Sequence, residues 1–244
     1  MVIYLYDGSF EGLLTSIYEA YYRREEPEEI HSLASVYTAS LFASSVTIET
    51  DPEKAEKVVQ SIQNKISSQA FRHSAYAFLS EAKGAELFIY QYLRLGWKVG
   101  PDVDRYLVDP VWTIHQLSGK VAKERHRMLG LLRFRLLRDD IYYGPMETDH
   151  NILGLLAPHF TRRLADQNWI IHDKKRSMAA LYNQKEWILT DLNREQVISL
   201  APEEKEYQAL WKDYFNNVTI TERKNLKQQR SYMPFRYWSY LIEK

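Results

Sequence analysis

The sequence predicts an α+β protein, and three features of the chain favour this fold class. The chain opens with a short apolar run rich in β-forming residues, Val2–Tyr6. From there to residue 127, apolar side chains recur mostly at helical spacing. After residue 127, short alternating runs separated by polar turns are typical of strands. We therefore expect a helix-rich region over residues 1–127 and an antiparallel sheet with C-terminal helices over residues 128–244, either as one compact domain or as two.

The first half is expected to hold a leading strand, a second strand and several helices. Asp7 or Ser9 can cap the first helix, because a side-chain oxygen there can accept a hydrogen bond from the free N–H groups of the first turn. The pair Asp51-Pro52 is typical of another helix start. We interpret the charged stretch 23–29 as a solvated helix end and loop. In order, the expected elements are a strand at 2–6, a helix from 10 to about 21, a strand at 46–49, helices between 52 and about 95, and a helix from 109 to about 126.

The second half is expected to follow a β-β-α-β-β-β plan, in which one helix covers an antiparallel sheet. Apolar and basic residues alternate over 132–137, which indicates a strand with one apolar face and one face that carries Arg133 and Arg135. The turn Asp139-Asp140 is expected to join this strand to the next one as an antiparallel hairpin. Pro158 is expected to kink or restart the covering helix. The expected elements are strands at 132–137, 141–147, 169–172, 177–182 and 187–190, a helix over 151–166, and two later helices, the second of which starts at Thr221.

The first of these late helices carries an aromatic and aliphatic stripe at helical spacing. Such a stripe is typical of a helix face that packs against a protein interior. We therefore expect it in the core rather than as a ligand platform. Its members are Tyr207, Leu210, Trp211, Tyr214 and Phe215.

Composition bounds the class of protein. The chain has 244 residues, 45% hydrophobic and 26% charged, which is typical of a soluble globular protein. It has no cysteine, which excludes disulfides, thiolate metal sites, iron–sulfur ligation and a cysteine nucleophile, and which fits a reducing cytoplasm. No apolar run approaches the roughly 20 residues that span a bilayer, and the N-terminus lacks the pattern of a signal peptide. We expect a cytoplasmic protein without a membrane partner.

Charge is distributed unevenly along the chain. Residues 1–119 hold 10 Lys and Arg against 16 Asp and Glu, whereas residues 120–244 hold 22 against 16. The net charge of the whole chain is zero, which argues against binding nucleic acid over the entire surface. The imbalance still permits a local basic surface on the second half.

Several short motifs in their order along the chain resemble one known family. They are Tyr6-Asp7-Gly8-Ser9-Phe10-Glu11-Gly12, His126-Arg127-Met128, Arg133-Phe134, Asp149-His150, Ala157-Pro158-His159-Phe160, Arg162-Arg163, Trp169-Ile170-Ile171-His172-Asp173, Met233-Pro234 and Tyr237-Trp238. Together they resemble the bacterial family described as "probable DNA metabolism protein, radical-SAM-associated". The second half also resembles the domain of unknown function found fused to uracil-DNA glycosylases. The resemblance implies a radical SAM protein as partner and a role in DNA repair or modification. A radical SAM activity of the chain itself is excluded by the lack of cysteine.

Basic residues of the second half are candidates for phosphate contacts, because each phosphate that a cation neutralises releases counterions and adds affinity. Three groups are available, and each could instead be a solvated face or pair with nearby carboxylates. Arg162 and Arg163 are adjacent, so we expect one of them to point toward the sheet as an internal ion-pair partner. The groups are Lys120, Lys123 and Arg127 on one helix face, Arg133 and Arg135 on one strand face, and Arg223, Lys227 and Arg230 on the last helix.

A sheet covered by a helix on one side leaves its other side open, as in the TATA-binding-protein-like module, where that face binds DNA. Arg133, Arg135, Tyr143 and Met146 would then lie on the open face. The comparison is an analogy of fold. The same face could equally be buried against helices.

The best catalytic candidates are His126, Glu147, Asp149 and His150, with His159 as a possible neighbour. Carboxylates and imidazoles can share acid–base work or bind a metal. Alternatively, Asp149 caps the following helix and Glu147 favours its N-terminus. The spacing matches no metal motif, and the chain has no phosphate-binding glycine loop, nucleophile elbow or dinucleotide fingerprint. We expect no metal and no cofactor.

Three functions follow from these patterns. The leading hypothesis is a DNA-metabolism accessory protein that binds nucleic acid and works with a radical SAM partner. Its phosphate contacts would come from Arg127, Arg133, Arg135, Arg223, Lys227 and Arg230. The alternatives are an enzyme that acts on DNA or a nucleobase through the four catalytic candidates, and a protein-interaction subunit that does not bind nucleic acid.

Overall fold

The computed structural model describes residues 2–34, 44–193, 199–220 and 225–243. The chain forms two compact units, Met1–Ala122 and Lys123–Lys244. Helix α5 (Asp109–Leu131) contains the division between them, and it also contains the expected boundary after residue 127. Both units mix helix and strand, so the α+β class is confirmed. No helix within the described ranges is long and apolar enough to cross a bilayer.

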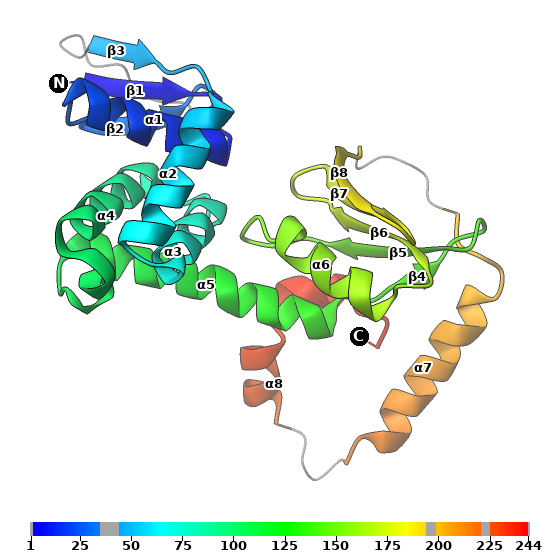
Figure 1. The fold of residues 1–244 in the computed structure, drawn as a ribbon. Helices are drawn as coiled ribbons and strands as arrows, with labels where there is room; N and C mark the ends of the chain where they lie inside the picture. The colour runs from blue at the N-terminus through cyan, green and yellow to red at the C-terminus, as the bar shows by residue number, and fades with distance from the viewer. Residues whose placement is uncertain (1, 35–43, 194–198, 221–224, 244) are drawn as a thin grey trace. The chain divides into compact units, whose positions relative to one another are not determined.

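The first unit begins with a small sheet in the order β2-β1-β3 (Figure 1). Strand β1 (Val2–Tyr6) pairs in parallel with both β2 (Glu29–Ser32) and β3 (Ser44–Thr47). The leading strand and a second strand near 46–49 were expected, whereas β2 falls at the end of a stretch interpreted as loop. Only Ile30 of β2 is fully buried, so the segment carries almost no apolar pattern, and its pairing with β1 makes it a strand.

Helices make up the rest of the first unit. Ser9 caps α1 (Phe10–Arg23) by accepting a hydrogen bond from the Gly12 N–H at 2.9 Å. Asp51 caps α2 (Pro52–Lys65) in the same way, through the N–H groups of residues 53 and 54. The expected helix starts are thus confirmed. The remaining helices are α3 (Ser68–Leu79), α4 (Ala85–Val99), the 3-10 helix η1 (Gly100–Arg105) and α5.

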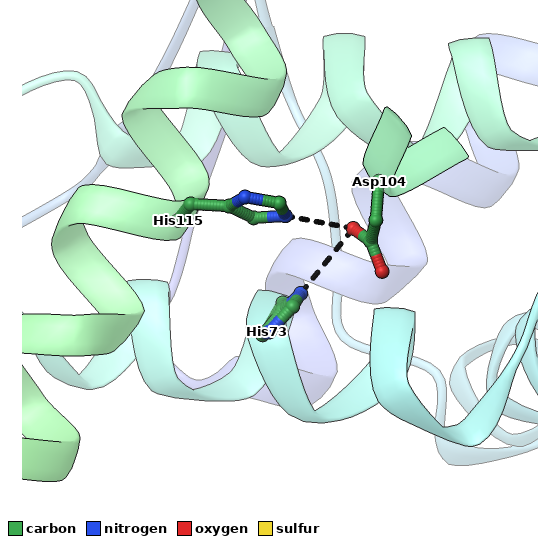
Figure 2. Close-up of side chains that lie close together, drawn as sticks. All are labelled: His73, Asp104 and His115. Atoms are coloured by element: carbon green, nitrogen blue, oxygen red, sulfur yellow. Dashed lines mark hydrogen bonds and ion pairs between the residues drawn. The ribbon is translucent and has the colours of Figure 1, made fainter. Parts of the chain in front are cut away.

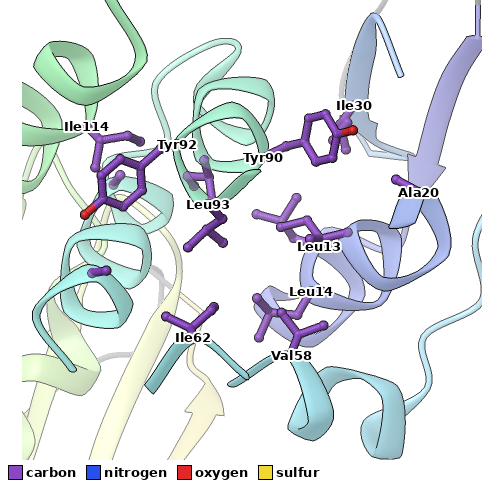
Figure 3. Packing of buried hydrophobic residues seen from close by; sticks show 14 of the residues in the cluster. Leu13, Leu14, Ala20, Ile30, Val58, Ile62, Tyr90, Tyr92, Leu93 and Ile114 are labelled. Atoms are coloured by element: carbon purple, nitrogen blue, oxygen red, sulfur yellow. The ribbon is translucent and has the colours of Figure 1, made fainter. Parts of the chain in front are cut away.

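The apolar core of the first unit joins its helices to its sheet (Figure 3). Leu13 of α1 and Ile62 of α2 are wholly buried, and so is Leu93 of α4. Burying each such side chain stabilises the fold by roughly 1.5–3 kcal/mol. This packing fixes α3, α4 and α5 relative to one another, and it thereby positions the polar side chains that these helices carry.

The second unit holds a five-stranded sheet in the order β4-β5-β6-β7-β8. Its elements are β4 (Arg135–Leu136), β5 (Ile141–Met146), α6 (Leu153–Arg163), β6 (Asn168–Asp173), β7 (Met178–Asn183), β8 (Trp187–Asp191), α7 (Glu204–Val218), α8 (Leu226–Tyr232) and the 3-10 helix η3 (Phe235–Tyr240). The expected β-β-α-β-β-β order is confirmed. The expected start of the last helix, Thr221, lies outside the described residues.

One pairing of this sheet corrects the prediction of an antiparallel sheet. Strands β5 and β6 are parallel, with Tyr143 opposite Ile170, whereas the other three pairs are antiparallel. The reason is the connection: α6 carries the chain back before β6 begins, and a helical crossover joins parallel strands. The sheet is therefore mixed.

Helix α6 lies against β6, β7 and β8 and covers one face of the sheet (Figure 1). Leu156, Ala157 and Phe160 are its buried contacts, and it continues through Pro158, which is exposed. Two residues proposed for an open sheet face do not lie on one, because Tyr143 is 7% exposed and Met146 is fully buried. The TATA-binding-protein analogy is therefore not supported at these positions.

Helix α7 corrects the prediction that its aromatic stripe is core. Tyr207, Leu210 and Tyr214 are 63%, 64% and 58% exposed. The helix is attached through polar groups instead, since the Glu204 carboxylate accepts a hydrogen bond from the Leu136 N–H at 2.8 Å. Helical spacing shows that apolar side chains share a face, but it does not show that another element covers that face.

Candidate functional site

A buried carboxylate, Glu124 of α5, organises the region that contains two of the predicted catalytic residues. The N–H groups of Asp149 and His150 each donate a hydrogen bond to it at 2.9 Å. His150 Nδ1 lies 2.5 Å from Glu124 Oε2, and the hydroxyl of Tyr237 donates to Oε1. The side chain of Glu124 is only 2% exposed. Its two oxygens are therefore occupied by donors from two segments of the second unit, residues 149–150 and η3.

These donors set the protonation of the network. Burial by itself raises the pKa of Glu124, but hydrogen bonds from His150, Tyr237 and the two backbone N–H groups outweigh burial and lower this pKa to about 2. An ionised carboxylate only accepts hydrogen bonds, so His150 Nδ1 must carry the proton that it shares with Glu124. Burial, and then the contact with Glu124, raise the pKa of Tyr237. The network is an ionised carboxylate held by hydrogen-bond donors, with the Arg236 guanidinium 3.7 Å from its Oε1.

The predicted catalytic residues are only partly brought together. Asp149 is exposed and its Oδ2 lies 2.8 Å from Arg236 Nη2, whereas His150 is turned toward Glu124. His126 is exposed and, being two residues after Glu124, projects from the opposite side of α5. Glu147 is half-buried and takes no part in the network of Glu124. Asp149 does not cap α6 either, since the residue at the N-cap is Ile152.

A second buried pair holds the same loop from its other side. Asp173 is fully buried, and its Oδ2 lies 2.7 Å from Arg176 Nη1. The Arg176 guanidinium also donates to the carbonyls of Thr148 and Asp149, at 3.2 and 3.0 Å. The loop 147–151 is therefore held by Glu124 directly and by Asp173 through Arg176, which is a structural role.

One of the predicted phosphate contacts, Arg133, is already paired with a carboxylate. Arg133 donates to both oxygens of Glu243, at 2.6 and 3.2 Å, and its guanidinium lies over the Trp211 ring at 5.6 Å. The Glu243 side chain is 2% exposed. Bidentate pairs of this kind are strong and directional. Arg133 thus holds α7 and the C-terminal segment and is not available to a polyanion.

The other predicted contacts lie in different settings. Arg127 donates to the Ser231 carbonyl at 3.0 Å, which places it beside α8, where Lys227 and Arg230 are exposed. Arg135 is half-buried. Arg223 lies outside the described residues. The structure therefore associates Arg127 with α8 but gives no single surface that contains all six predicted residues.

A different cationic group stands at the C-terminal end of α6. Arg162 and Arg163 are both exposed, which corrects the expectation that one of them points into the sheet. Arg125 of α5 donates to the Leu155 carbonyl at 3.2 Å and so joins α6. Burial, and then the charges of Arg163, Arg162 and Arg125, lower the pKa of His159. We call these four residues the α6 cationic cluster.

No carboxylate from the described ranges forms an ion pair with the three arginines of this cluster. His159, Arg162 and Arg163 share one helix face because they are three and four residues apart. The opposite face of α6 is packed on the sheet. The three arginines of the α6 cationic cluster therefore carry positive charge without a carboxylate partner among the described residues, on a rigid support and around His159.

The first unit contains two histidines and an aspartate that sequence reasoning missed (Figure 2). Asp104 of η1 lies between His115 of α5 and His73 of α3. Its Oδ1 is 2.8 Å from His115 Nε2 and 3.4 Å from His73 Nδ1. The Tyr92 hydroxyl donates to the same oxygen at 2.7 Å. One potential ligand atom from each of the three residues lies within 4.8 Å of the others.

These residues could hold a metal ion, because imidazole nitrogens and a carboxylate oxygen are common ligands of divalent transition metals. No local motif joins them, since they come from three elements that only the fold brings together. The short spacing from Asp104 to His115 crosses the turn between η1 and α5. An Asp and a His at this spacing are too common in sequences for the pair to indicate a metal site.

Comparison with known families gives one result. A family model described as a domain of unknown function, DUF4130, matches residues 83–243. The chain belongs to the DUF4130 family. The DUF4130 match covers the whole α6 cationic cluster, Glu124, Asp104 and His115, but not His73. It fits the expected likeness to the domain fused to uracil-DNA glycosylases. A search of curated proteins finds no match.

Proposed function

We propose that this protein is a nucleic-acid-binding accessory protein of DNA metabolism, and that the α6 cationic cluster contacts the phosphate backbone. The observation that carries the proposal is the unpaired positive charge of Arg125, Arg162 and Arg163 around His159. Phosphate contacts of arginine dominate the affinity of most nucleic-acid-binding proteins. They position a nucleic acid without reading its sequence.

The support for the cluster favours this function. Leu156, Ala157 and Phe160 anchor α6 on the sheet, so its exposed face presents the cations in a fixed arrangement. The cluster also falls on the motif through which the chain resembles a DNA-metabolism family. That resemblance supplies the rest of the proposal, namely a radical SAM protein as partner in DNA repair or modification.

The set of contacts differs from the one expected from the sequence. Arg133 drops out, because Glu243 neutralises it. Lys227 and Arg230 remain candidates, because both are exposed on α8. The proposal therefore rests first on the α6 cationic cluster and only second on α8.

A binding assay tests the proposal. Fluorescence anisotropy of labelled single- and double-stranded DNA would be measured over a range of salt with the wild type and with Arg162→Ala/Arg163→Ala. We expect the double variant to bind about 10-fold more weakly or worse. Its plot of log affinity against log salt for duplex DNA should be less steep by about 2, since two phosphate contacts are lost.

The matched control is Lys205→Ala/Lys212→Ala, which removes two exposed cations from α7. It should bind like the wild type. Equal affinity and equal salt dependence in Arg162→Ala/Arg163→Ala would overturn the proposal. So would wild-type binding no tighter than that of an unrelated protein of zero net charge.

A second candidate function is a protein-interaction subunit, and the exposed stripe of α7 favours it. Tyr207, Leu210 and Tyr214 leave an apolar face uncovered by described residues, and such faces mark interaction sites. The variant Tyr207→Ser/Leu210→Ser/Tyr214→Ser should then lose co-purification with the radical SAM protein while it keeps DNA binding. Co-purification that survives this change, or that never occurs with the wild type, would remove the candidate.

A further inference from the structure

We propose that His73, Asp104 and His115 bind one divalent transition-metal ion, with zinc as the favoured ion. The site lies within the first unit and is separate from the α6 cationic cluster. Two imidazoles and one carboxylate form a ligand set that suits zinc and other first-row divalent metals.

The distances within the set fit a shared ion. Zinc binds nitrogen and oxygen ligands at about 2.0–2.2 Å, so ligand atoms around a tetrahedral ion lie about 3.3 Å apart. Asp104 Oδ1 lies 2.8 Å from His115 Nε2 and 3.4 Å from His73 Nδ1. Because all three ligand atoms lie within 4.8 Å of one another, side-chain rotations would bring them around one ion.

His73 Nδ1 and the second oxygen of Asp104, Oδ2, are both open to a ligand. His73 Nδ1 is buried and makes no hydrogen bond with the described residues, since its 3.4 Å separation from Asp104 is too long for a good one. Asp104 Oδ1 takes the contacts of Tyr92 and His115, whereas no hydrogen bond from the described parts of the chain reaches Oδ2. A buried imidazole nitrogen without a hydrogen bond is costly, and a metal ion would satisfy it.

Neighbouring side chains orient the proposed ligands. The hydroxyl of Tyr92, a fully buried residue, donates to Asp104 at 2.7 Å and fixes the carboxylate. The side-chain amide of Gln69 lies 2.7 Å from His73 Nε2, the nitrogen that faces away from Asp104. A metal-bound His73 would donate its Nε2–H, and the Gln69 amide can accept this hydrogen bond with its side-chain oxygen turned toward the ring. The helices α3, α4 and α5 that carry these groups are packed in one core.

The site would keep an open position. It has three protein ligands, and the side chains of Asp104 and His115 are 27% and 36% exposed. A zinc ion with three protein ligands completes its coordination with water or another small ligand. The proposed ion is therefore exchangeable and accessible to chelators.

Metal titration tests the proposal with the full chain. After chelator treatment and dialysis, isothermal titration with zinc sulfate should show one equivalent bound. Asp104→Asn and His115→Gln should each bind at least about 30-fold more weakly. The control His126→Gln removes an exposed histidine outside the set and should bind like the wild type.

Cobalt(II) provides a second measurement, which reports the metal coordination by visible absorption. The wild type should show visible absorption typical of four- or five-coordinate cobalt, and Asp104→Asn should not. Circular dichroism would show whether each variant is folded. Binding of less than one equivalent by the wild type would overturn the proposal, and so would equal zinc affinity in folded Asp104→Asn and wild type, because the metal would then bind elsewhere.

Discussion

Glu124 and Asp104 each contact histidine, and their surroundings differ. Glu124 in the second unit is 2% exposed, and donors fill both of its oxygens. Asp104 in the first unit is 27% exposed, and its hydrogen bonds from described residues fall on Oδ1. The comparison teaches that a histidine beside a carboxylate does not define a site. What decides between a closed support and a set of open ligand atoms is how many carboxylate oxygens already accept hydrogen bonds.

The pKa of each carboxylate is lowered, but by different sets of hydrogen bonds. Burial opposes ionisation at both, but at Asp104 the hydrogen bonds from His115 and Tyr92 still lower the pKa. At Glu124 two backbone N–H groups are added, and the pKa falls to about 2. Backbone donors are fixed by the fold and cannot rotate away. We therefore expect Glu124 to contribute more than Asp104 to the stability of the folded protein.

The largest expected effect therefore comes from Glu124→Gln. The amide keeps the shape but places an NH₂ group where an ionised oxygen now accepts backbone hydrogen bonds. We expect the free energy of unfolding at pH 7 to fall by about 3 kcal/mol. Urea denaturation followed by circular dichroism would measure it. A loss below about 1 kcal/mol would mean that Glu124 is not the closed support described above.

The same carboxylate predicts a pH dependence. Because folding lowers the pKa of Glu124 from 4.5 to about 2, its contribution is fully present above pH 4.5 and is lost as the pH falls toward 2. Wild-type stability should fall across this window more steeply than that of Glu124→Gln. The unfolding free energy of both proteins would be measured by denaturation at several pH values between 2 and 5. If its dependence on pH is the same for the wild type and Glu124→Gln, the interpretation is wrong.

Tyr237→Phe should have an intermediate effect. It removes one donor from Glu124 and leaves the ring in place. Since a hydrogen bond to a charged group contributes about 1.5–3 kcal/mol, we expect a loss near 2 kcal/mol. Tyr232→Phe is the control, because Tyr232 is 69% exposed. Equal stabilities of the two variants in urea would contradict the assignment.

Asp104→Asn should have the smallest effect. Asparagine can still accept the hydrogen bond from Tyr92, and the side chain is partly exposed. We expect the unfolding free energy without metal to change by less than about 1 kcal/mol. A loss as large as that of Glu124→Gln would show that Asp104 also mainly stabilises the fold. The difference drawn between Asp104 and Glu124 would then be wrong.

Local patterns predicted most elements because their causes are local. Ser9 and Asp51 sit where a helix needs a cap, and the turn at Asp139-Asp140 leads into the strand that pairs with β4. The prediction errors arose where a segment distant in the sequence determines how an element pairs or whether it is covered. Strand β2 depends on β1, the β5 and β6 pairing depends on the α6 crossover, and the stripe of α7 has no described element over it.

Site prediction followed the same division. Asp149 and His150 were found as an unusual local cluster, but their partner Glu124 looks in the sequence like one more charge on a long helix. Arg133 was expected to be free because Glu243, its partner, is far away in the chain. His73, Asp104 and His115 were missed because no motif links them.

The amino-acid order alone determined the α+β class, the positions of most helices and strands, the exclusion of cysteine chemistry and the basic character of the second half. Only the tertiary structure decided which charges are used internally and which stay open. The physical reason is that periodicity and capping act between residues a few positions apart, whereas ion pairs and ligand sets depend on distances of a few ångströms between segments that the chain separates by tens of residues.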